Sequence, residues 1–154
     1  MKRSYTFTAY PTQGQERDLS RLFGCCRVVK NVFLQEMMTA IETGNHITYS
    51  EAQKRATTLL KQQDEYRFLQ DVSAVALQQA VRDKTAAFRN FVTSKNGTRK
   101  GKKVGFPKFE KRKHRQTARF VQNTAKSNFV VRVPKGCKWG FVKLPKLKDR
   151  KSVV

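Results

Sequence analysis

The chain has 154 residues, a length typical of one domain with a hydrophobic core, and a formal net charge of +22. It contains no run of about 18 apolar residues that could span a membrane, and its basic first residues lead into an alternating segment instead of the apolar part of a secretory signal. Three cysteines, two of them adjacent, fit no disulfide framework and indicate a reduced, cytoplasmic setting.

The first predicted elements are a strand and two helices. Residues 4–9 alternate between apolar and polar side chains, which predicts a half-buried strand. Thr12 and Gln15 form a capping-box pattern that starts a short helix. Gly24 is expected to interrupt it, and a longer helix follows up to Gly44. Two helices joined at a glycine outline a helix-turn-helix, and an ordinary helical hairpin fits the pattern as well.

Two further helices are predicted between residues 48 and 95. Thr48 and Glu51 form a second capping box. Residues 64–71 are expected to be a polar connection, after which Ser73 caps a long helix that ends before an Asn-Gly turn. Lys84 falls near the apolar stripe of this helix, so we expect it at the edge of the core.

Residues 99–119 are the most informative stretch, and we call them the basic segment. They hold eleven Lys, Arg or His residues and one acid, Glu110. Such a block cannot be buried, so it is either a solvated linker or a surface for polyanions. Phe106 and Phe109, which flank a Pro-Lys pair, are unusual in disordered tails and favour the surface.

The predicted binding residues follow from these charges. Nucleic acid is favoured over an anionic membrane because the basic segment has no amphipathic helical pattern. Phe106 and Phe109 could stack on bases, although packing under a barrel suits the prolyl turn better. The candidate phosphate contacts are Arg99, Lys100, Lys102, Lys103, Lys108, Lys111, Arg112, Lys113 and Arg115.

Beyond the basic segment, apolar residues recur at every second position instead of every third or fourth. Residues 118–122, 128–133 and 140–144 predict short strands, and residues 146–154 have no pattern and are expected to fray. Together with the strand at 4–9, they predict an α+β fold. In it, a helical, helix-turn-helix-like lobe is inserted into a small, incomplete antiparallel β-barrel.

Six motifs, in this order, resemble the TnpB family, the OrfB-type accessory proteins of bacterial insertion sequences. They are Tyr10-Pro11-Thr12-x-x-Gln15, Phe23-Gly24-Cys25-Cys26-Arg27-Val28-Val29-Lys30-Asn31, the run from Phe68 to Asp83, Ala87-Phe88-Arg89-Asn90-Phe91, Gly105-Phe106-Pro107-Lys108-Phe109 and Lys143-Leu144-Pro145-Lys146-Leu147. The resemblance implies a wedge barrel with an inserted recognition lobe. It also implies binding of a guide RNA from the transposon end and of double-stranded DNA at a transposon-adjacent motif.

The resemblance also implies a domain layout. Residues 1–9 would be the first wedge strand, 10–95 the helical recognition lobe, 96–116 a basic connection, 117–145 the remaining wedge strands and 146–154 the tail. It places Tyr49 and Gln78 near the adjacent-motif DNA, where a glutamine can pair with adenine. Arg27 and Lys30 lie opposite the apolar face of their helix, where they suit a groove or phosphate, or simply solvent.

The departures from the family concern its catalytic part. TnpB proteins cleave DNA with a RuvC-like domain whose carboxylates hold two metal ions. Only Glu110 and Asp149 are acidic beyond Asp83, and the paired CxxC zinc motif is absent. The cysteines and histidines show no metal-ligand spacing, so we expect no metal, cofactor or catalytic residue, and Cys25 is expected to fill the core.

The predicted function is therefore that of a nucleic-acid-binding, non-cleaving piece of a TnpB-like protein, cytoplasmic and associated with the nucleoid. Lys84, where the family tends to carry an apolar residue, is a further departure. Three alternatives remain open: a free-standing DNA- or RNA-binding repressor of a transposon, a generic basic RNA-binding assembly factor, and a gene remnant. The oligomeric state is left open.

Overall fold

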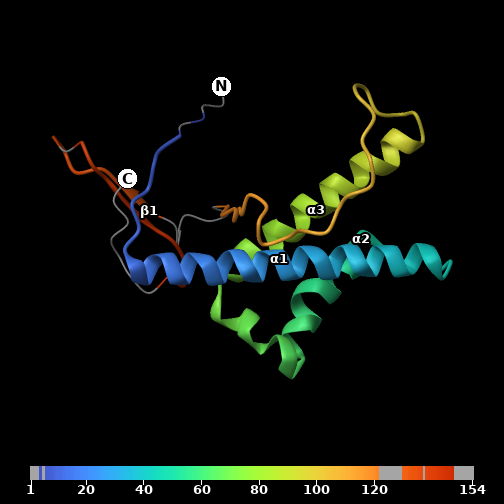
Figure 1. The fold of residues 1–154 in the computed structure, drawn as a ribbon, viewed down its shortest axis with the longest axis horizontal. Coiled ribbons are helices and arrows are strands. Elements are labelled where there is room, and N and C mark those ends of the chain that lie inside the picture. Colours follow the sequence, from blue (N-terminus) through green and yellow to red (C-terminus); the bar gives the residue numbers. More distant parts are fainter. Residues whose placement is uncertain (1–3, 5, 122–129, 137, 148–154) are drawn as a thin grey trace. The chain divides into compact units, whose positions relative to one another are not determined.

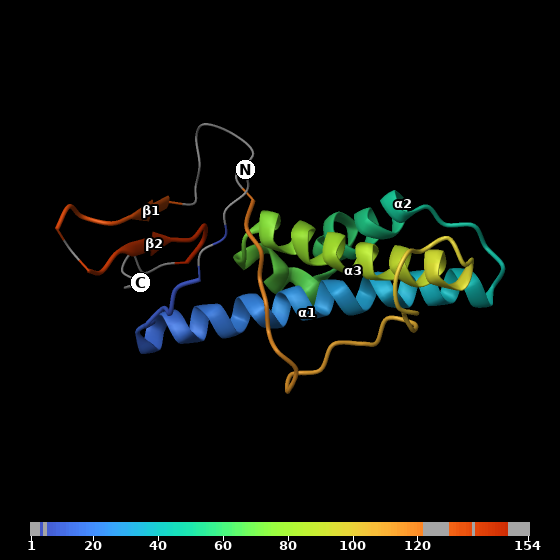
Figure 2. The same cartoon turned by 90° about the horizontal axis from the view of Figure 1, so that it is seen from above.

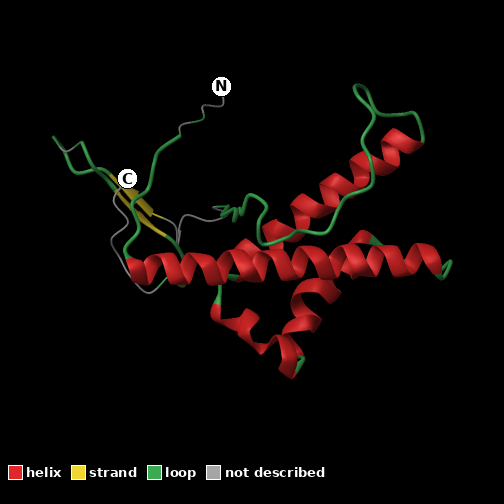
Figure 3. Ribbon diagram, in the orientation of Figure 1, coloured by secondary structure: helices red, strands yellow, loops and turns green. Residues whose placement is uncertain are grey.

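The computed structural model describes residues 4, 6–121, 130–136 and 138–147. The chain forms two compact units: residues 22–120, which we call the helical unit, and residues 1–21 with 121–154, which we call the terminal unit. Helices dominate, and one short pair of strands lies late in the sequence (Figure 3). Among the described residues, no helix is both long enough and apolar enough to cross a bilayer.

Helix α1 (Gln13–Glu42) is the longest element, with 30 residues. The predicted capping box closes its first turn: the Thr12 N–H donates to Gln15 Oε1 over 2.9 Å, and the Gln15 N–H donates to Thr12 Oγ1 over 3.4 Å. The helix runs through Gly24 without a break (Figure 1), so the predicted interruption there is wrong.

Packing on both sides of Gly24 explains the continuity of α1. Leu22, Cys25, Val29 and Phe33 are all buried, and their three- and four-residue spacing places them on one face of the helix. Burial of one such side chain contributes about 1.5–3 kcal/mol. A glycine inside a helix costs only about 1 kcal/mol relative to alanine. The core contacts therefore outweigh the weak helix propensity of Gly24.

Helix α2 (Tyr49–Lys54) begins at the second predicted capping box. The Glu51 N–H donates to Thr48 Oγ1 over 3.2 Å, and the Thr48 N–H donates to Glu51 Oε2 over 2.9 Å. Hydrogen bonds from the Thr48 backbone and hydroxyl lower the pKa of Glu51.

The chain after α2 changes its helical pitch instead of continuing as α-helix. It widens into the π-helical turn η1 (Arg55–Leu59) and tightens into the 3₁₀ turn η2 (Leu60–Gln62). Residues 64–71, expected to be a polar connection, form the 3₁₀ segment η3 (Asp64–Asp71), which is kinked at Tyr66, where φ is −109° and ψ is 15°. Leu69, which is completely buried, attaches η3 to the core.

Helix α3 (Ala74–Lys95) follows Ser73 and ends before Asn96 and Gly97, as predicted. Gly97 has φ +72°, a left-handed conformation that glycine adopts without strain. Ser73 occupies the N-cap position, but its side chain makes no capping hydrogen bond. Helices α1 and α3 run beside each other in the helical unit (Figure 2), and Cys26 Sγ lies 3.9 Å from the Ala76 carbonyl oxygen.

Strands β1 (Val130–Arg132) and β2 (Phe141–Lys143) form one antiparallel pair, with Val131 opposite Val142. They confirm the predicted strands at 128–133 and 140–144 in part, because the described strands are shorter. Residues 122–129, Cys137 and the tail from 148 lie outside the described residues, so the predictions made for them remain untested.

The predicted barrel is not formed by the described residues. Residues 4 and 6–9 are not in a strand, and residues 118–121 are not either. The alternation at 118–120 has a different cause: Ala118 and Phe120 pack against the helical core, while Arg119 pairs with Asp83 on α3. A period of two fixes which side chains share a face, but a strand also needs a backbone partner.

Candidate nucleic-acid interface

The basic segment returns along the helical unit after α3 and is attached to it at several points. The first is Phe106, whose ring lies edge-on to Phe88 and Phe91 of α3, with centroids 5.8 and 5.1 Å away. Such edge-to-face contacts are favourable beyond simple area burial. Phe106 therefore packs on α3 and not under a barrel, although 37% of it stays exposed.

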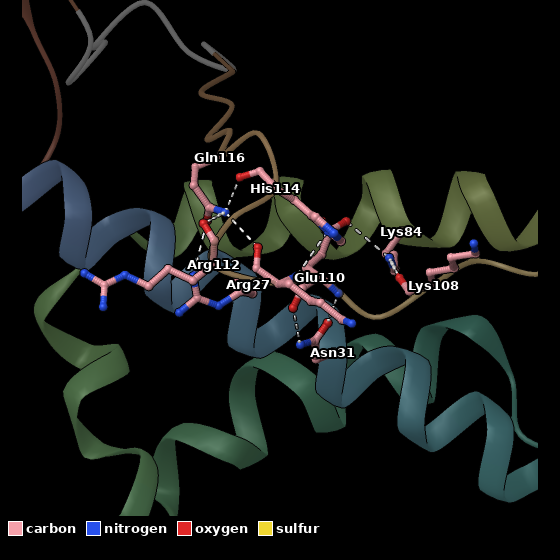
Figure 4. A network of polar contacts seen from close by, with 9 residues as sticks. Arg27, Asn31, Lys84, Lys108, Glu110, Arg112, His114 and Gln116 are labelled. Carbon is pink, nitrogen blue, oxygen red and sulfur yellow. Dashed lines mark hydrogen bonds and ion pairs between the residues drawn. The ribbon is translucent and has the colours of Figure 1, made fainter.

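Asn31 of α1 provides the second attachment. Its side-chain Nδ2 donates to the Glu110 carbonyl oxygen over 3.1 Å, and its Oδ1 accepts from the Glu110 N–H over 2.8 Å. One amide side chain thus satisfies both backbone groups of a residue that has no strand partner. This pair of bonds fixes the position of the basic segment on α1 (Figure 4).

Lys84 of α3 provides the third attachment and lies deeper than the core edge expected from its sequence position. Its side chain is only 7% exposed, and its Nζ donates to the Lys108 carbonyl oxygen and lies 3.2 Å from Glu110 Oε1. A buried ammonium group needs such partners to offset its desolvation. The single acid of the basic segment therefore compensates a cation of the helical core.

Residues 111–116, which we call the KRKHRQ turn, are closed by their own last residue. Gln116 Nε2 lies 3.1 Å from the carbonyl oxygens of Lys111 and Arg112 and 2.7 Å from that of His114. Its Oε1 accepts from Arg27 Nη1 of α1 over 3.4 Å (Figure 4). Three carbonyl oxygens of the turn are thereby engaged, and its Lys and Arg side chains are exposed.

Most predicted phosphate contacts are exposed on the helical unit. Arg99 is half-buried and donates to the Lys102 carbonyl oxygen, so its guanidinium is partly occupied within the segment. Phe109 is 38% exposed. The exposed basic residues of the prediction are Lys100, Lys102, Lys103, Lys108, Lys111, Arg112, Lys113 and Arg115.

The candidates on the helices are placed less uniformly. Arg27 is half-buried and contacts the KRKHRQ turn, and Lys30 is half-buried on the same helix. Tyr49 packs edge-on to Phe88 at 6.1 Å, and the Arg89 guanidinium lies 4.8 Å from its ring centroid. Gln78 is exposed on α3. Of these four residues, Arg27 has a hydrogen bond to the basic segment.

Asn31, Lys84, Glu110 and Gln116 were not among the predicted site residues, yet they position the segment. Two signals for part of this arrangement were present in the sequence: a lysine in an apolar stripe, and a lone acid in a basic block. Opposite charges that are each out of place suggest a pair. Nothing in the sequence indicated the contacts of Asn31 and Gln116, because uncharged polar residues are common at such positions.

Cys25 and Cys26 belong to the core, not to a reactive site. Both are buried, as expected for Cys25. Burial raises the pKa of Cys26 to about 11, which disfavours the thiolate needed for nucleophilic or metal chemistry. Within the part of the chain that the structure describes, no three His, Cys, Asp or Glu residues form a group that could hold a metal ion.

Comparison with known proteins connects this arrangement to a family. A family model for a helix-turn-helix domain of OrfB proteins of the IS605 type matches residues 1–46. The chain is 38% identical over 114 residues to a Streptomyces pristinaespiralis protein named "Putative RNA-guided DNA endonuclease", a match that covers 73% of this chain and 26% of that protein. It is 32% identical over 127 residues to the Escherichia coli protein named "Putative RNA-guided DNA endonuclease InsQ", covering 79% of this chain and 29% of that protein. The chain spans less than a third of the length of these relatives, and it belongs to the TnpB/OrfB family of transposon proteins.

Proposed function

We propose that this chain is the nucleic-acid-binding part of a TnpB-like protein and binds a guide RNA and transposon-adjacent double-stranded DNA. The observation that carries the proposal is the basic segment, whose one acid is engaged by a buried lysine, Lys84, at 3.2 Å. Arg119 pairs with Asp83, and among the described residues the other exposed Lys and Arg side chains of the segment form no ion pair. Such a surface attracts the phosphate backbone, and binding releases the counterions condensed on it.

The proposed division of labour follows the family resemblance. The helical unit corresponds to the recognition lobe, with Tyr49 and Gln78 facing the DNA motif and Arg27 and Lys30 on α1 beside the backbone. The terminal unit corresponds to the wedge, and among the described residues its strands are β1 and β2. Residues 96–116 form the basic connection, which lies within the helical unit. In the cell, a protein of this kind would be found with the nucleoid.

We further propose that the residues of this chain do not cleave DNA by themselves. Two-metal phosphodiester cleavage needs several carboxylates around a pair of ions. Beyond Asp83 the sequence holds two acids, Glu110 and Asp149, and Glu110 pairs with Lys84. The relatives named as endonucleases are more than three times as long as the matched region. Their cleavage activity is therefore not transferred to this chain.

The test is to purify the chain from its host, wash it in about 0.5 M salt, where phosphate contacts are strongly weakened, and sequence the retained RNA. One enriched RNA that maps to a transposon end supports guide binding. Bulk ribosomal RNA that washes off overturns guide binding and favours a generic assembly factor. Retention of transposon-end DNA without RNA overturns it as well and favours a repressor.

A matched pair of variants separates local from overall charge in this test. The first triple variant removes three cations from the KRKHRQ turn and combines Arg112→Gln, Lys113→Gln and Arg115→Gln. The second triple variant, the control, removes three exposed cations from other parts of the helical unit and combines Lys54→Gln, Arg67→Gln and Arg82→Gln. We expect the first triple variant to lose most of the retained RNA and the second to keep it. Equal losses would contradict a binding surface on the basic segment.

A further inference from the structure

The KRKHRQ turn differs from an ordinary basic tail because its backbone is held in place. Within the turn, the His114 N–H donates to the Lys111 carbonyl oxygen over 3.1 Å, and the Lys111 N–H donates to His114 Nδ1 over 3.3 Å. The Gln116 amide adds contacts to three carbonyl oxygens. The NH₂ group of Gln116 has two hydrogens, which it shares among these three acceptors. The backbone of the turn is thereby closed around the Gln116 side chain.

The turn is also attached to the helices at both ends. Before it, both backbone groups of Glu110 are bonded by Asn31 of α1. After it, Arg119 forms an ion pair with Asp83 of α3. At the last residue of the turn, Arg27 of α1 donates to Gln116 Oε1 over 3.4 Å. Two helices of the packed core thus fix where the turn lies.

Four cations extend from this fixed backbone, and all of them are exposed: Lys111, Arg112, Lys113 and Arg115. A disordered basic tail must lose conformational entropy when it binds, which reduces its affinity. A preformed turn has already lost most of this entropy on folding. A fixed set of cations gains most from a ligand whose phosphates are also fixed, as they are in a base-paired helix.

We propose that the KRKHRQ turn is a preformed binding element for the phosphate backbone of a base-paired nucleic acid, with Gln116 and Arg27 as its positioning residues. This inference rests on the proposed function and adds the binding element and the form of its ligand. It also changes the role of Arg27, which holds the turn through Gln116 instead of contacting phosphate itself.

The test measures the binding of the full chain to three probes with equal numbers of phosphates: an RNA duplex and a DNA duplex of about 20 base pairs, and single-stranded oligouridine. The positioning variant is Gln116→Ala, which changes no charge. The charge variant combines Arg112→Gln and Arg115→Gln. The matched control is Gln62→Ala, a glutamine exposed on η2.

We expect Gln116→Ala to weaken duplex binding by about tenfold, since the turn must then be ordered on binding. The same variant should lose much less affinity for single-stranded oligouridine. Its slope of log K against log salt should equal that of the wild type, because the same phosphates are neutralised. The charge variant should reduce this slope by about 1.8 on duplex DNA, and Gln62→Ala should change neither quantity.

Binding stoichiometry at saturation separates positioning from misfolding, because unfolded protein lowers the number of sites and leaves the affinity of the remaining ones unchanged. The inference is overturned if Gln116→Ala binds duplexes as tightly as the wild type. It is also overturned if the variant loses the same factor in affinity for duplex and single-stranded probes. In both cases the proposed function stands. If the wild type binds none of the probes at low salt, the proposed function is overturned. Tighter binding of either duplex supports the inference and identifies the nucleic acid.

Discussion

Lys84 and Glu110 form a contact at which the helical core and the basic segment meet. The lysine side chain is 7% exposed and the glutamate side chain 29%. If the pair is broken, water can therefore reach the glutamate more easily than the lysine. A buried charge without its partner is costly, whereas an accessible carboxylate is rehydrated when its partner is lost. The pair should therefore respond asymmetrically to substitution.

We predict that Glu110→Gln costs more unfolding free energy than Lys84→Met, by about 1 kcal/mol, because it leaves the ammonium buried. In a double-mutant cycle, the coupling should be about 1–2 kcal/mol, as measured by urea unfolding. The control is the exposed pair of Glu36 and Arg55, whose side chains are 32% and 54% exposed. Its cycle should give less than about 1 kcal/mol. Equal coupling in both pairs would contradict the burial argument.

Cys26 gives a second prediction at the scale of single residues. With a pKa of about 11, about one thiol in a thousand is ionised at pH 8, compared with about a quarter for an ordinary thiol of pKa 8.5. We expect iodoacetamide to modify Cys26 more than a hundredfold more slowly in the folded chain than in guanidinium. Peptide mass mapping at a series of times measures both rates. Rapid modification of the folded chain would show that the contact between α1 and α3 opens easily.

At the scale of elements, Gly24 within α1 and Gly44 after its end have opposite conformational roles. Gly24 lies inside the helix, and a Cβ built there has no atom within 4 Å. Gly44 follows the end of α1 with φ +69°, where an L-residue is strained. One glycine is thus tolerated by its helix, and the other ends it.

We predict that Gly24→Ala stabilises the chain by about 0.5–1 kcal/mol through its higher helix propensity. Gly44→Ala should destabilise it by about 1–2 kcal/mol because of the left-handed backbone. Urea unfolding of both variants gives the two free energies. A loss of stability in Gly24→Ala would indicate that the chain turns at this glycine, as the helix-turn-helix pattern in the sequence suggests.

At the scale of the whole molecule, the charge is concentrated in one part of the sequence. Residues 91–154 hold 20 Lys or Arg and 2 Asp or Glu, whereas residues 1–90 hold 13 and 9. The free energy of binding a polyanion should therefore come mainly from the second part, through the exposed cations of the basic segment. Tyr49 and Gln78, on the helices, would affect which sequence is bound more than how tightly.

We predict a linear fall of log K with log salt for binding of the full chain. If about six phosphates are neutralised, the slope is about −4 for single strands and −5 for B-DNA. Replacing Gln78 by alanine should leave this slope unchanged, because an amide neutralises no phosphate. Fluorescence anisotropy at several salt concentrations measures it. A slope near zero would exclude the basic segment as the contact surface.

Local structure and the chemical class of the basic segment follow from neighbouring residues in the sequence. Both capping boxes and the end of α3 depend on neighbouring residues and were predicted correctly, and β1 and β2 lie within two of the predicted strand segments. The density of cations in the basic segment is a property of the sequence alone. It predicted a polyanion surface without any knowledge of the fold.

Other features depend on contacts between residues that are distant in the sequence, and these follow from the fold. The burial of Leu22, Cys25 and Phe33 keeps α1 straight through Gly24, and the helical core receives Ala118 and Phe120 in place of a barrel. The positions of Glu110 and Gln116 on the helices depend on residues about 80 to 90 positions away in the sequence. Local patterns fix periodicity and charge, but the free energy of long-range packing chooses the partners of each side chain.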